Sequence, residues 1–470
     1  MLFLLALISA LHQNIHAAPT LITEVPRRVS TQLAPSGPNC ACPNTRSVWN
    51  IVWTCVVTII ACSWVSVHPN IPAPGRKEWQ VALMRLELMV WTIIAPEMMI
   101  FWAIRQWIGA RKLASLYNDK EHENWTKTHG YFIQMGGFVL YHGSRRGGVL
   151  SPERMEALLR DRLIEFPTIT EEEIQDRSKG DALSKMLVIG QTSWFIAQCI
   201  TRRAQGLIMT ELELVTLAFA ALNSFMYFFW WNKPLDVRTR VPVYVYDKPI
   251  PEKESPNDEL SSQSNSPLRI TAAQHEPQAK AVRHYWNRVT GFILNLFFRW
   301  PWQGVVRMFA RLGDMAEFAG RSNVIEDNQE KVHPFYAMNT SDKESNRIVG
   351  IVSIIGIIFG GIHCAGWGFL FPTHAEQVIW QVTSVIVTGV PVFMVISVIS
   401  QTIYFQTETF CLERFLEDLK DVSITIAIYF GLPLYIIARL VLLGEALVAL
   451  RSLPAGAFLE VQWTSFLPHV

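Results

Sequence analysis

Long apolar runs that alternate with polar stretches constrain this 470-residue chain more than any other feature of its sequence. Half of the residues are apolar and only 17% are charged, whereas a soluble domain carries about 25% charged residues. Several of the runs reach about 20 residues, the length at which a helix spans the hydrocarbon core of a bilayer. The pattern therefore predicts an integral membrane protein and excludes a soluble enzyme.

The charge balance excludes a second class of protein. The 41 basic residues are matched by 40 acidic residues, so the formal net charge is +1. A protein that binds nucleic acid needs a basic patch or stripe against the phosphate backbone, and this sequence has none. We therefore expect the lipid bilayer as a partner, and no nucleic acid.

The N-terminal segment has the pattern of a secretory signal peptide. Apolar residues 2–11 are followed by two alanines and a proline, which is typical of a cleavage site. We predict that residues 1–18 are removed; a short uncleaved anchor is the alternative. The protein would then enter the secretory pathway and reside in the endoplasmic reticulum, the vacuolar membrane or the plasma membrane.

The rest of the chain divides into membrane regions and polar regions. In order, they are a polar stretch (19–47), the first membrane helices (48–108), a polar helical region (109–185), a membrane helix pair (186–231), a linker with interfacial helices (232–347), the last membrane helices (348–450) and a tail (451–470). Residues 250–280 are rich in Pro, Glu, Ser and Asn and predict a disordered linker. The fold predicted is an all-α polytopic bundle of about seven spans, within a range of six to eight.

Two shorter apolar segments cannot cross a bilayer. The Gly-rich patch 131–141 is too short for a membrane helix, so we expect it either in a core or at the membrane surface. The charge-free run 289–298 is also too short, and its aromatic and basic surroundings favour an amphipathic helix that lies in the interface.

Two rules disagree about the orientation of the loops. Cleavage of a signal peptide leaves the N-terminal tail outside, and counting on from there also places the basic loops near Arg111 and Arg238 outside. Basic residues near membrane ends favour the cytoplasmic side instead. One segment that fails to cross would reconcile the rules, and the two candidates are 81–108 and 186–200.

Charged residues inside the apolar runs are the first candidates for function, because each costs at least about 2.5 kcal/mol at the centre of a membrane helix. Glu87 and Glu97 lie in the second run, and Arg439 lies deep in the last. They either form part of a substrate or proton path or make a structural ion pair. From their depth along the helices we predict that Arg439 is neutralised by Glu97 or by Glu87.

His363 lies in a glycine-rich membrane run. It could relay protons or bind a ligand, although a histidine hydrogen-bonded to a neighbouring helix is the plainer interpretation. Gly356 and Gly360 have the spacing that lets two membrane helices approach closely. We expect close helix packing from these glycines.

An acidic cluster precedes the last span and is the one metal candidate. Glu417, Asp418 and Asp421 have the spacing of residues that hold Mg²⁺ and a diphosphate in prenyl-converting enzymes. The signal is weak, because charges before a membrane helix are ordinary and no second acidic motif matches it. No metal is therefore assigned, and no cofactor is identified.

Two sequons provide candidates for N-glycosylation. Asn124 and Asn339 are each followed two residues later by Thr or Ser. They accept a glycan only if their loops face the lumen.

Several stretches resemble one group of proteins when they are taken together. They are CSWVSVHPNIPAPG, LMVWTIIAPEMMIFWAIRQW, WTKTHGYFIQMGGF, the long block 169–237, FGGIHCAGWGFLFPT and the C-terminal YIIARLVLL with RSLPAG. In combination they resemble a large family of functionally uncharacterised polytopic membrane proteins from filamentous and mushroom-forming fungi. The resemblance covers nearly the whole mature chain and is weakest through 250–280. It implies an integral membrane protein of fungal type and supplies no catalytic residues.

Three classes of function remain open from the sequence. The first is a membrane protein that binds or moves a small apolar or amphipathic ligand. The second is an intramembrane enzyme of terpenoid or lipid metabolism, in which the acidic cluster or Glu87 and Glu97 would act. The third is a receptor or scaffold. No inverted repeat relates the two halves, which weakens the case for a transporter.

Overall fold

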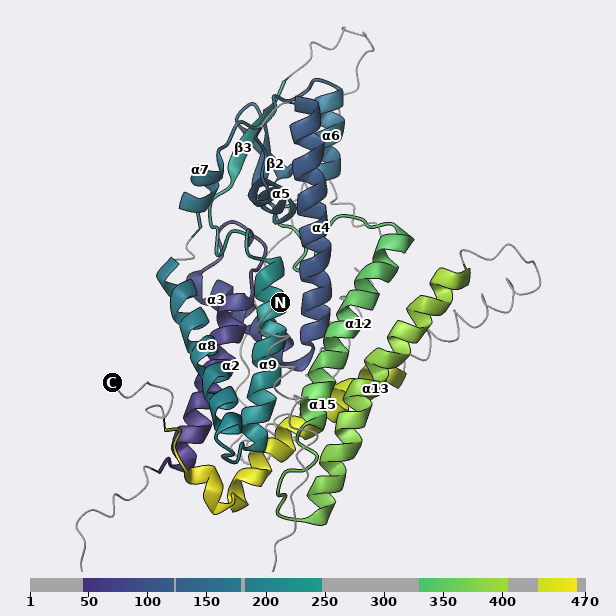
Figure 1. Ribbon diagram of the computed structural model, residues 1–470. Helices are drawn as coiled ribbons and strands as arrows, with labels where there is room; N and C mark the ends of the chain where they lie inside the picture. The colour runs from purple at the N-terminus through teal and green to yellow at the C-terminus, as the bar shows by residue number, and fades with distance from the viewer. Residues whose placement is uncertain (1–44, 122–123, 179–181, 247–328, 405–429, 463–470) are drawn as a thin grey trace, which may run out of the picture.

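The long helices form a bundle that carries a smaller unit at one end (Figure 1). The computed structural model describes residues 45–121, 124–178, 182–246, 329–404 and 430–462. The helices of the bundle are α2 (Val48–Ser66), α8 (Ala182–Ala204), α9 (Glu211–Phe229), α12 (Asp342–Cys364), α13 (His374–Tyr404) and α15 (Leu432–Val448). Two further helices, α3 (Glu78–Ile94) and α4 (Pro96–Glu121), connect the bundle to the polar unit, which comprises residues 124–178, 235–246 and the outer end of α4. The predicted signal peptide, linker and interfacial run lie outside the described residues.

Fewer helices qualify as membrane spans than the sequence predicts. Within the described residues, α2, α9, α12, α13 and α15 are the five single helices long and apolar enough to cross a membrane. The pair α3 and α4 would add a sixth span, but it is bent by 112°. Helix α8 covers the predicted run 186–200 and carries Gln191, Gln198 and two arginines, which reduce its hydropathy. Among the described residues the structure therefore supports five or six spans, and the predicted seven are not confirmed.

Pro96 divides the apolar run 81–108 into two helices. Helix α3 ends before Ala95, which leaves the helical region with φ −140° and ψ 61°. A proline disfavours the helical conformation in the residue before it, yet it fits the first position of a new helix. The break falls at the middle of the apolar run. A prediction from hydropathy alone therefore treats the two helices as one span.

Both outer ends of this bent pair lie at the polar unit. At the start of α3, the Glu78 carboxylate lies 3.2 Å from Arg238 of the polar unit. At the far end of α4, Leu113 and Tyr117 are buried in the core of the polar unit. The pair α3–α4 therefore enters the bundle and leaves it at the same end.

The polar unit contains a small sheet, so the all-α prediction is wrong for this part of the chain. Helices α5 (Lys127–Gln134), α6 (Pro152–Arg160) and α7 (Glu171–Asp176) surround strands β1 (Phe138–His142), β2 (Arg145–Val149) and β3 (Val241–Val245). The strand order is β2-β1-β3, with β1 antiparallel to β2 and parallel to β3. Since β3 comes from a distant part of the sequence, its pairing leaves no local pattern.

The short apolar patch 131–141 belongs to the core of the polar unit. Phe132 and Phe138 are fully buried, and their rings meet edge to face with centroids 5.2 Å apart. Trp125 lies parallel to Phe138 at 6.2 Å. Of the two predicted placements, core or membrane surface, the first is confirmed.

The predicted glycine contact joins α12 to α13. A Cβ atom added at Gly360 would lie 2.3 Å from the Thr388 hydroxyl, and one at Gly356 would lie 2.9 Å from the Pro391 ring. No larger side chain fits at Gly360 unless the two helices move apart. The interpretation of these glycines as a close-packing surface is confirmed.

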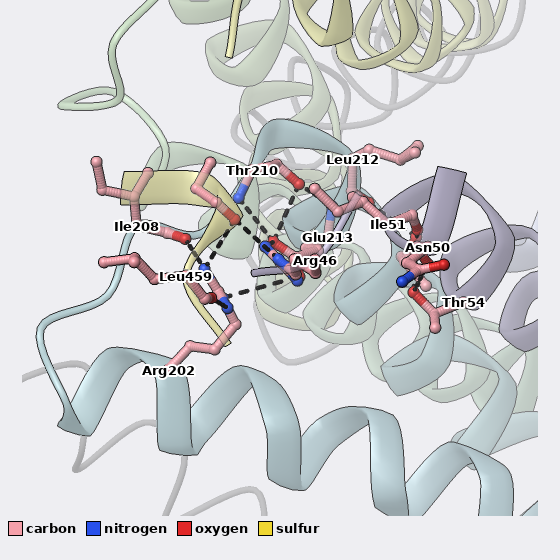
Figure 2. A network of polar contacts seen from close by, with 12 residues as sticks. Arg46, Asn50, Ile51, Thr54, Arg202, Ile208, Thr210, Leu212, Glu213 and Leu459 are labelled. Atoms are coloured by element: carbon pink, nitrogen blue, oxygen red, sulfur yellow. Dashed lines mark hydrogen bonds and ion pairs between the residues drawn. The ribbon is translucent and has the colours of Figure 1, made fainter. Parts of the chain in front are cut away.

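The end of the bundle opposite the polar unit joins three distant segments (Figure 2). Arg46 is hydrogen-bonded to the carboxylate of Glu213 in the first turn of α9, and its main-chain N–H donates to Phe458 O at 2.7 Å. Arg202 at the end of α8 donates to Leu459 O at 2.7 Å and to Ile208 O at 2.6 Å. The short helices η3 (Ala449–Ser452) and η4 (Ala455–Phe458) lead the chain into this junction. It fixes the start of α2, the α8–α9 loop and the C-terminal segment to one another.

Candidate functional site

The centre of the bundle holds an ion pair between helices from the two halves of the chain. Glu97 lies in the first turn of α4, and Arg439 lies midway along α15. Arg439 Nη1 donates to both carboxylate oxygens of Glu97, at 2.8 and 2.9 Å. The Tyr435 hydroxyl donates to the same carboxylate at 2.7 Å. Of the two partners predicted for Arg439, the structure selects Glu97.

Aromatic rings complete the surroundings of Arg439. Its guanidinium carbon lies 4.0 Å from the ring centroid of Phe359 and 4.9 Å from that of Phe219. The side chain is 3% exposed, and its Nε and Nη2 atoms have no hydrogen-bond acceptor among the described residues. One carboxylate and two aromatic faces therefore balance this charge. An arrangement in which Glu97 is already bound on both oxygens favours helix association over proton abstraction.

The other intramembrane candidates have different surroundings. Glu87 lies on the exposed side of α3. His363 is buried in α12, where its Nδ1 donates to Phe359 O, one turn earlier, at 2.9 Å. Its ring packs between Phe359, at 4.5 Å, and Trp380, at 5.9 Å. The ring is therefore hydrogen-bonded in a packed core, as the plainer interpretation expects, but its partner lies in the same helix and not in a neighbouring one.

The structure describes the two sequons but not the predicted metal cluster. Glu417, Asp418 and Asp421 lie outside the described residues, and among the described ones no group of three His, Cys, Asp or Glu side chains could hold a metal ion. Asn124 and Asn339 are both exposed. Both asparagines lie toward the polar-unit end, since one precedes α5 and the other precedes α12.

A buried lysine at the junction of bundle and polar unit has no counterpart in the sequence analysis. Lys233 follows α9, and its amine donates to His68 O at 2.5 Å, Gln106 Oε1 at 2.9 Å and Asn70 Oδ1 at 3.1 Å. All three acceptors are neutral. Because these acceptors come from two other segments, no local pattern around Asn232-Lys233-Pro234 predicts them. The neighbouring aromatic run 227–231 is the one local feature that belongs to the surroundings of the lysine.

Tryptophan rings and a histidine enclose this lysine. The amine lies 4.6 Å from the ring centroid of Trp102 and 5.0 Å from that of Trp230. Burial lowers the pKa of Lys233 well below its ordinary range. Burial also lowers the pKa of His68 to about 3, and the charge of Lys233 adds to that effect. His68 is therefore neutral near pH 7, and the cluster serves to hold α4, α9 and the 67–71 loop together.

The bundle also contains a pocket, between α2, α8 and α9, with a volume of about 260 Å³. We call it the α2–α8–α9 pocket. Its polar lining consists of Ser66, Thr192, Ser193, Asn223, Ser224 and Tyr227. Ser66 Oγ donates to Asn223 Oδ1 at 2.8 Å, whereas the Tyr227 hydroxyl is buried without a partner among the described residues. The sequence gives one indication of these residues, because their hydroxyl groups interrupt apolar runs. It does not indicate that they meet in one pocket, since that depends on how the three helices pack.

Comparison with known proteins gives one match. A model of a family of unknown function (DUF8562) matches residues 21–250 and 318–470. No curated protein and no solved structure matches the chain. The two matched segments include every element described above and amount to well over half of the sequence. The chain therefore belongs to the family of unknown function DUF8562.

Proposed function

We propose that this integral membrane protein binds a small amphipathic lipid in the α2–α8–α9 pocket. The observation that carries the proposal is the pocket itself, a space of about 260 Å³ between α8 and the candidate membrane spans α2 and α9, with polar groups from all three helices in its wall. Ligand sites in helical bundles are mostly apolar and contain a few polar groups that fix orientation. The pocket has this composition.

The distribution of lining residues favours a ligand with a polar head and an apolar tail. Tyr227 and Ser66 lie at the ends of α9 and α2 that face the polar unit. Ala220 lies seven residues before Tyr227 in α9, which is about 10 Å deeper into the bundle. Val188, Ile189 and Ile196 of α8 add apolar contacts, before and after Thr192 and Ser193 of the same helix. A hydroxyl-bearing head would meet the unpartnered Tyr227 hydroxyl, and the tail would extend toward Ala220.

The pocket is accessible from the surroundings of the bundle. Ile189, Ser193 and Ser224 line it and are exposed on the surface of the helices. A lipid could therefore enter sideways from the membrane, and part of its tail could remain among other lipids. Binding is the part of the predicted function that this geometry supports; transport has no such support.

The topology supports a definite orientation. Because α3–α4 leaves the bundle at the end where it enters, Arg111, Arg238 and Arg240 all lie at the polar-unit end, opposite Arg46. If α8 returns the chain across the membrane to Arg202, this arrangement supports a reconciliation of the two orientation rules, with the N-terminal tail in the lumen and the basic loops in the cytoplasm. We infer a membrane of the secretory pathway on this basis, and the fungal origin stays a prediction from the sequence.

The test is photo-crosslinking of the purified full chain. Sterol and diacylglycerol probes that carry a diazirine and an alkyne are irradiated with the protein, and labelled peptides are mapped by mass spectrometry. We expect label from at least one probe on α8 near 188–196 and on α9 near 220–227, because these segments line the pocket.

A pair of serine variants provides the control. Ser224→Phe places a ring at the pocket and should abolish the label, whereas Ser400→Phe makes the same change on α13 and should leave it. Equal labelling of both variants, or label spread over α12 and α13, would contradict the proposal.

A further inference from the structure

A second pocket, with a volume of about 440 Å³, lies where α3 begins against the polar unit. Its walls come from the 72–76 loop, the first turn of α3, strands β1 and β2, and residues 238–240. Four arginines line it, namely Arg76, Arg146, Arg238 and Arg240. Glu78 is the one carboxylate among its lining residues. We call it the arginine pocket.

Among the residues that the structure describes, carboxylates form ion pairs with only one of these arginines. Arg238 Nε lies 2.8 Å from Asp236, and its Nη2 lies 3.2 Å from Glu78. This contact also occupies the Glu78 carboxylate, which would otherwise repel an anion. Arg238 and Glu78 therefore form a wall of the pocket that carries little net charge.

Arg240 is held in place by neutral groups. Its Nε donates to Gly136 O at 3.0 Å, and its Nη2 donates to Pro72 O at 3.0 Å. Main-chain carbonyl groups orient the guanidinium without cancelling its charge. Within the described part of the chain, Nη1 makes no hydrogen bond, so its two N–H groups remain available.

Arg76 and Arg146 add two further positive charges. Both side chains are exposed, and neither forms an ion pair with another described residue. Burial and the nearby charge of Arg146 lower the pKa of Arg240 to about 10, although Glu330 offsets part of that effect. Guanidinium groups that repel one another across a pocket would be relieved by a bound anion.

The neighbouring face of α3 relates this pocket to the membrane. Trp79, Leu83, Leu86 and Val90 are 42–59% exposed, and their spacing places them on one side of the helix. Trp79 follows Glu78 directly at the edge of the pocket, and tryptophan is enriched at the level of lipid headgroups. An apolar strip suited to acyl chains therefore begins where the arginines converge.

We propose that the arginine pocket binds a phosphate group, carried by a lipid whose acyl chains lie along the exposed face of α3. Arg240 would donate from Nη1, held in place by its contacts with main-chain carbonyls, and Arg76 and Arg146 would close on the phosphate from the surface. Guanidinium groups bind phosphate oxygens in paired, charge-assisted hydrogen bonds. The site is separate from the α2–α8–α9 pocket and does not depend on the function proposed for it.

The experiment measures binding to the purified full chain in a neutral detergent by microscale thermophoresis. The probes are short-chain phosphatidic acid, short-chain phosphatidylcholine and inorganic phosphate. We expect phosphatidic acid to bind most tightly, since it combines a phosphate monoester with apolar chains. Inorganic phosphate with an equal affinity would keep the phosphate site but identify a soluble source.

Two adjacent arginines on β2 provide a matched pair of variants. Arg146 lines the pocket, whereas Arg145 is also exposed but does not line it, as expected from the alternation of side chains along a strand. Arg146→Gln should weaken phosphatidic acid binding about tenfold, the effect of one lost charge-assisted hydrogen bond. Arg145→Gln should change it by less than about twofold, because it removes only screened surface charge.

Three outcomes would overturn the proposal. The first is that neither phosphatidic acid nor inorganic phosphate binds the wild-type chain. The second is an equal loss in the two variants, which would indicate attraction to surface charge in general. The third is equal binding of phosphatidylcholine, which would mean that the apolar chains alone are recognised. Since Arg146 is exposed, its substitution is not expected to impair folding.

Discussion

The bundle centre and its junction with the polar unit each bury one cation, and they neutralise it by different means. At the centre, Arg439 meets the carboxylate of Glu97 at 2.8 Å. At the junction, the nearest acceptors of Lys233 are three neutral oxygens, and two tryptophan rings lie beside it. Arg439 is therefore stabilised by one opposite charge, whereas Lys233 is stabilised by several weaker contacts with neutral groups.

The difference matters for how each region tolerates change. Removing one member of a buried ion pair leaves an uncompensated charge in a region of low dielectric constant. Removing a cation that is held by neutral groups leaves oxygens without donors, which is a smaller cost. A single substitution at the bundle centre should therefore lower the free energy of unfolding more than a single substitution at the junction.

The largest expected effect is at the centre. Arg439→Leu leaves the largely buried Glu97 carboxylate without its opposite charge and with only the Tyr435 hydroxyl donating to it, which costs roughly 3–5 kcal/mol of the free energy of unfolding. This is a large fraction of the roughly 5–15 kcal/mol that stabilises a typical domain, so membrane expression should collapse. Expression level and thermal unfolding in detergent measure the effect.

A second substitution distinguishes the two glutamates. Glu97→Gln combined with Arg439→Leu removes both charges and should restore part of the expression, whereas Glu87→Gln should restore none, because Glu87 is exposed on α3. Recovery with either glutamine, or with neither, would mean that the ion pair does not dominate the stability of the centre.

A smaller effect is expected at the junction. Lys233→Met removes the donor to His68 O, Asn70 and Gln106 and should cost about 1–3 kcal/mol. Lys112→Met is the control, because Lys112 forms an exposed pair with Glu344 at 2.7 Å and should cost at most about 1 kcal/mol. A loss at Lys233 as large as that of Arg439→Leu would remove the contrast between the two regions.

Acid should also destabilise the junction. Protonation of one group changes the free energy of unfolding by at most about 1.4 kcal/mol for each pH unit. His68 is neutral in the fold with a pKa of about 3, against 6.5 in the unfolded chain, and Lys233, Lys185 and Arg85 oppose its protonation. The unfolded chain binds more protons below pH 6.5, so the stability contributed by His68 is present above that pH and is lost as the pH falls toward 3.

His68→Asn tests this dependence, because the amide can replace the Nδ1 donor to Ser66 O. Thermal unfolding between pH 7 and pH 4 should change less steeply in the variant than in the wild type. An unchanged slope would assign the acid sensitivity to other groups.

The contrast explains how far the sequence could predict this protein. A charge inside an apolar run is costly, so Glu97 and Arg439 were visible as candidates and their helical positions indicated contact. Lys233 was not visible, because it follows a membrane helix, where lysine is common. Its acceptors lie on segments that only the tertiary fold brings together. For the same reason β3 and the α2–α8–α9 pocket escaped prediction. Pro96 did indicate a bend in the second apolar run, but neither proline nor hydropathy indicated that the bend would reach 112°.

The last prediction is that the wild-type protein carries no N-linked glycan. Its test determines which side of the membrane the junction faces. If the polar-unit end is cytoplasmic, Asn124 and Asn339 never meet the lumenal glycosylation enzymes, and treatment of the wild-type protein with an endoglycosidase should leave its mobility unchanged. Leu21→Asn creates a sequon with Thr23 on the tail that follows the predicted signal peptide, and this variant should gain one glycan that the enzyme removes. The added sequon is the positive control for the pathway, because a silent result in both proteins would show that the tail does not enter the lumen. A mobility shift in the wild type would place the polar unit on the lumenal side, and the basic loops around Arg238 and Arg240 would then contradict the distribution of positive charge that supports the proposed topology.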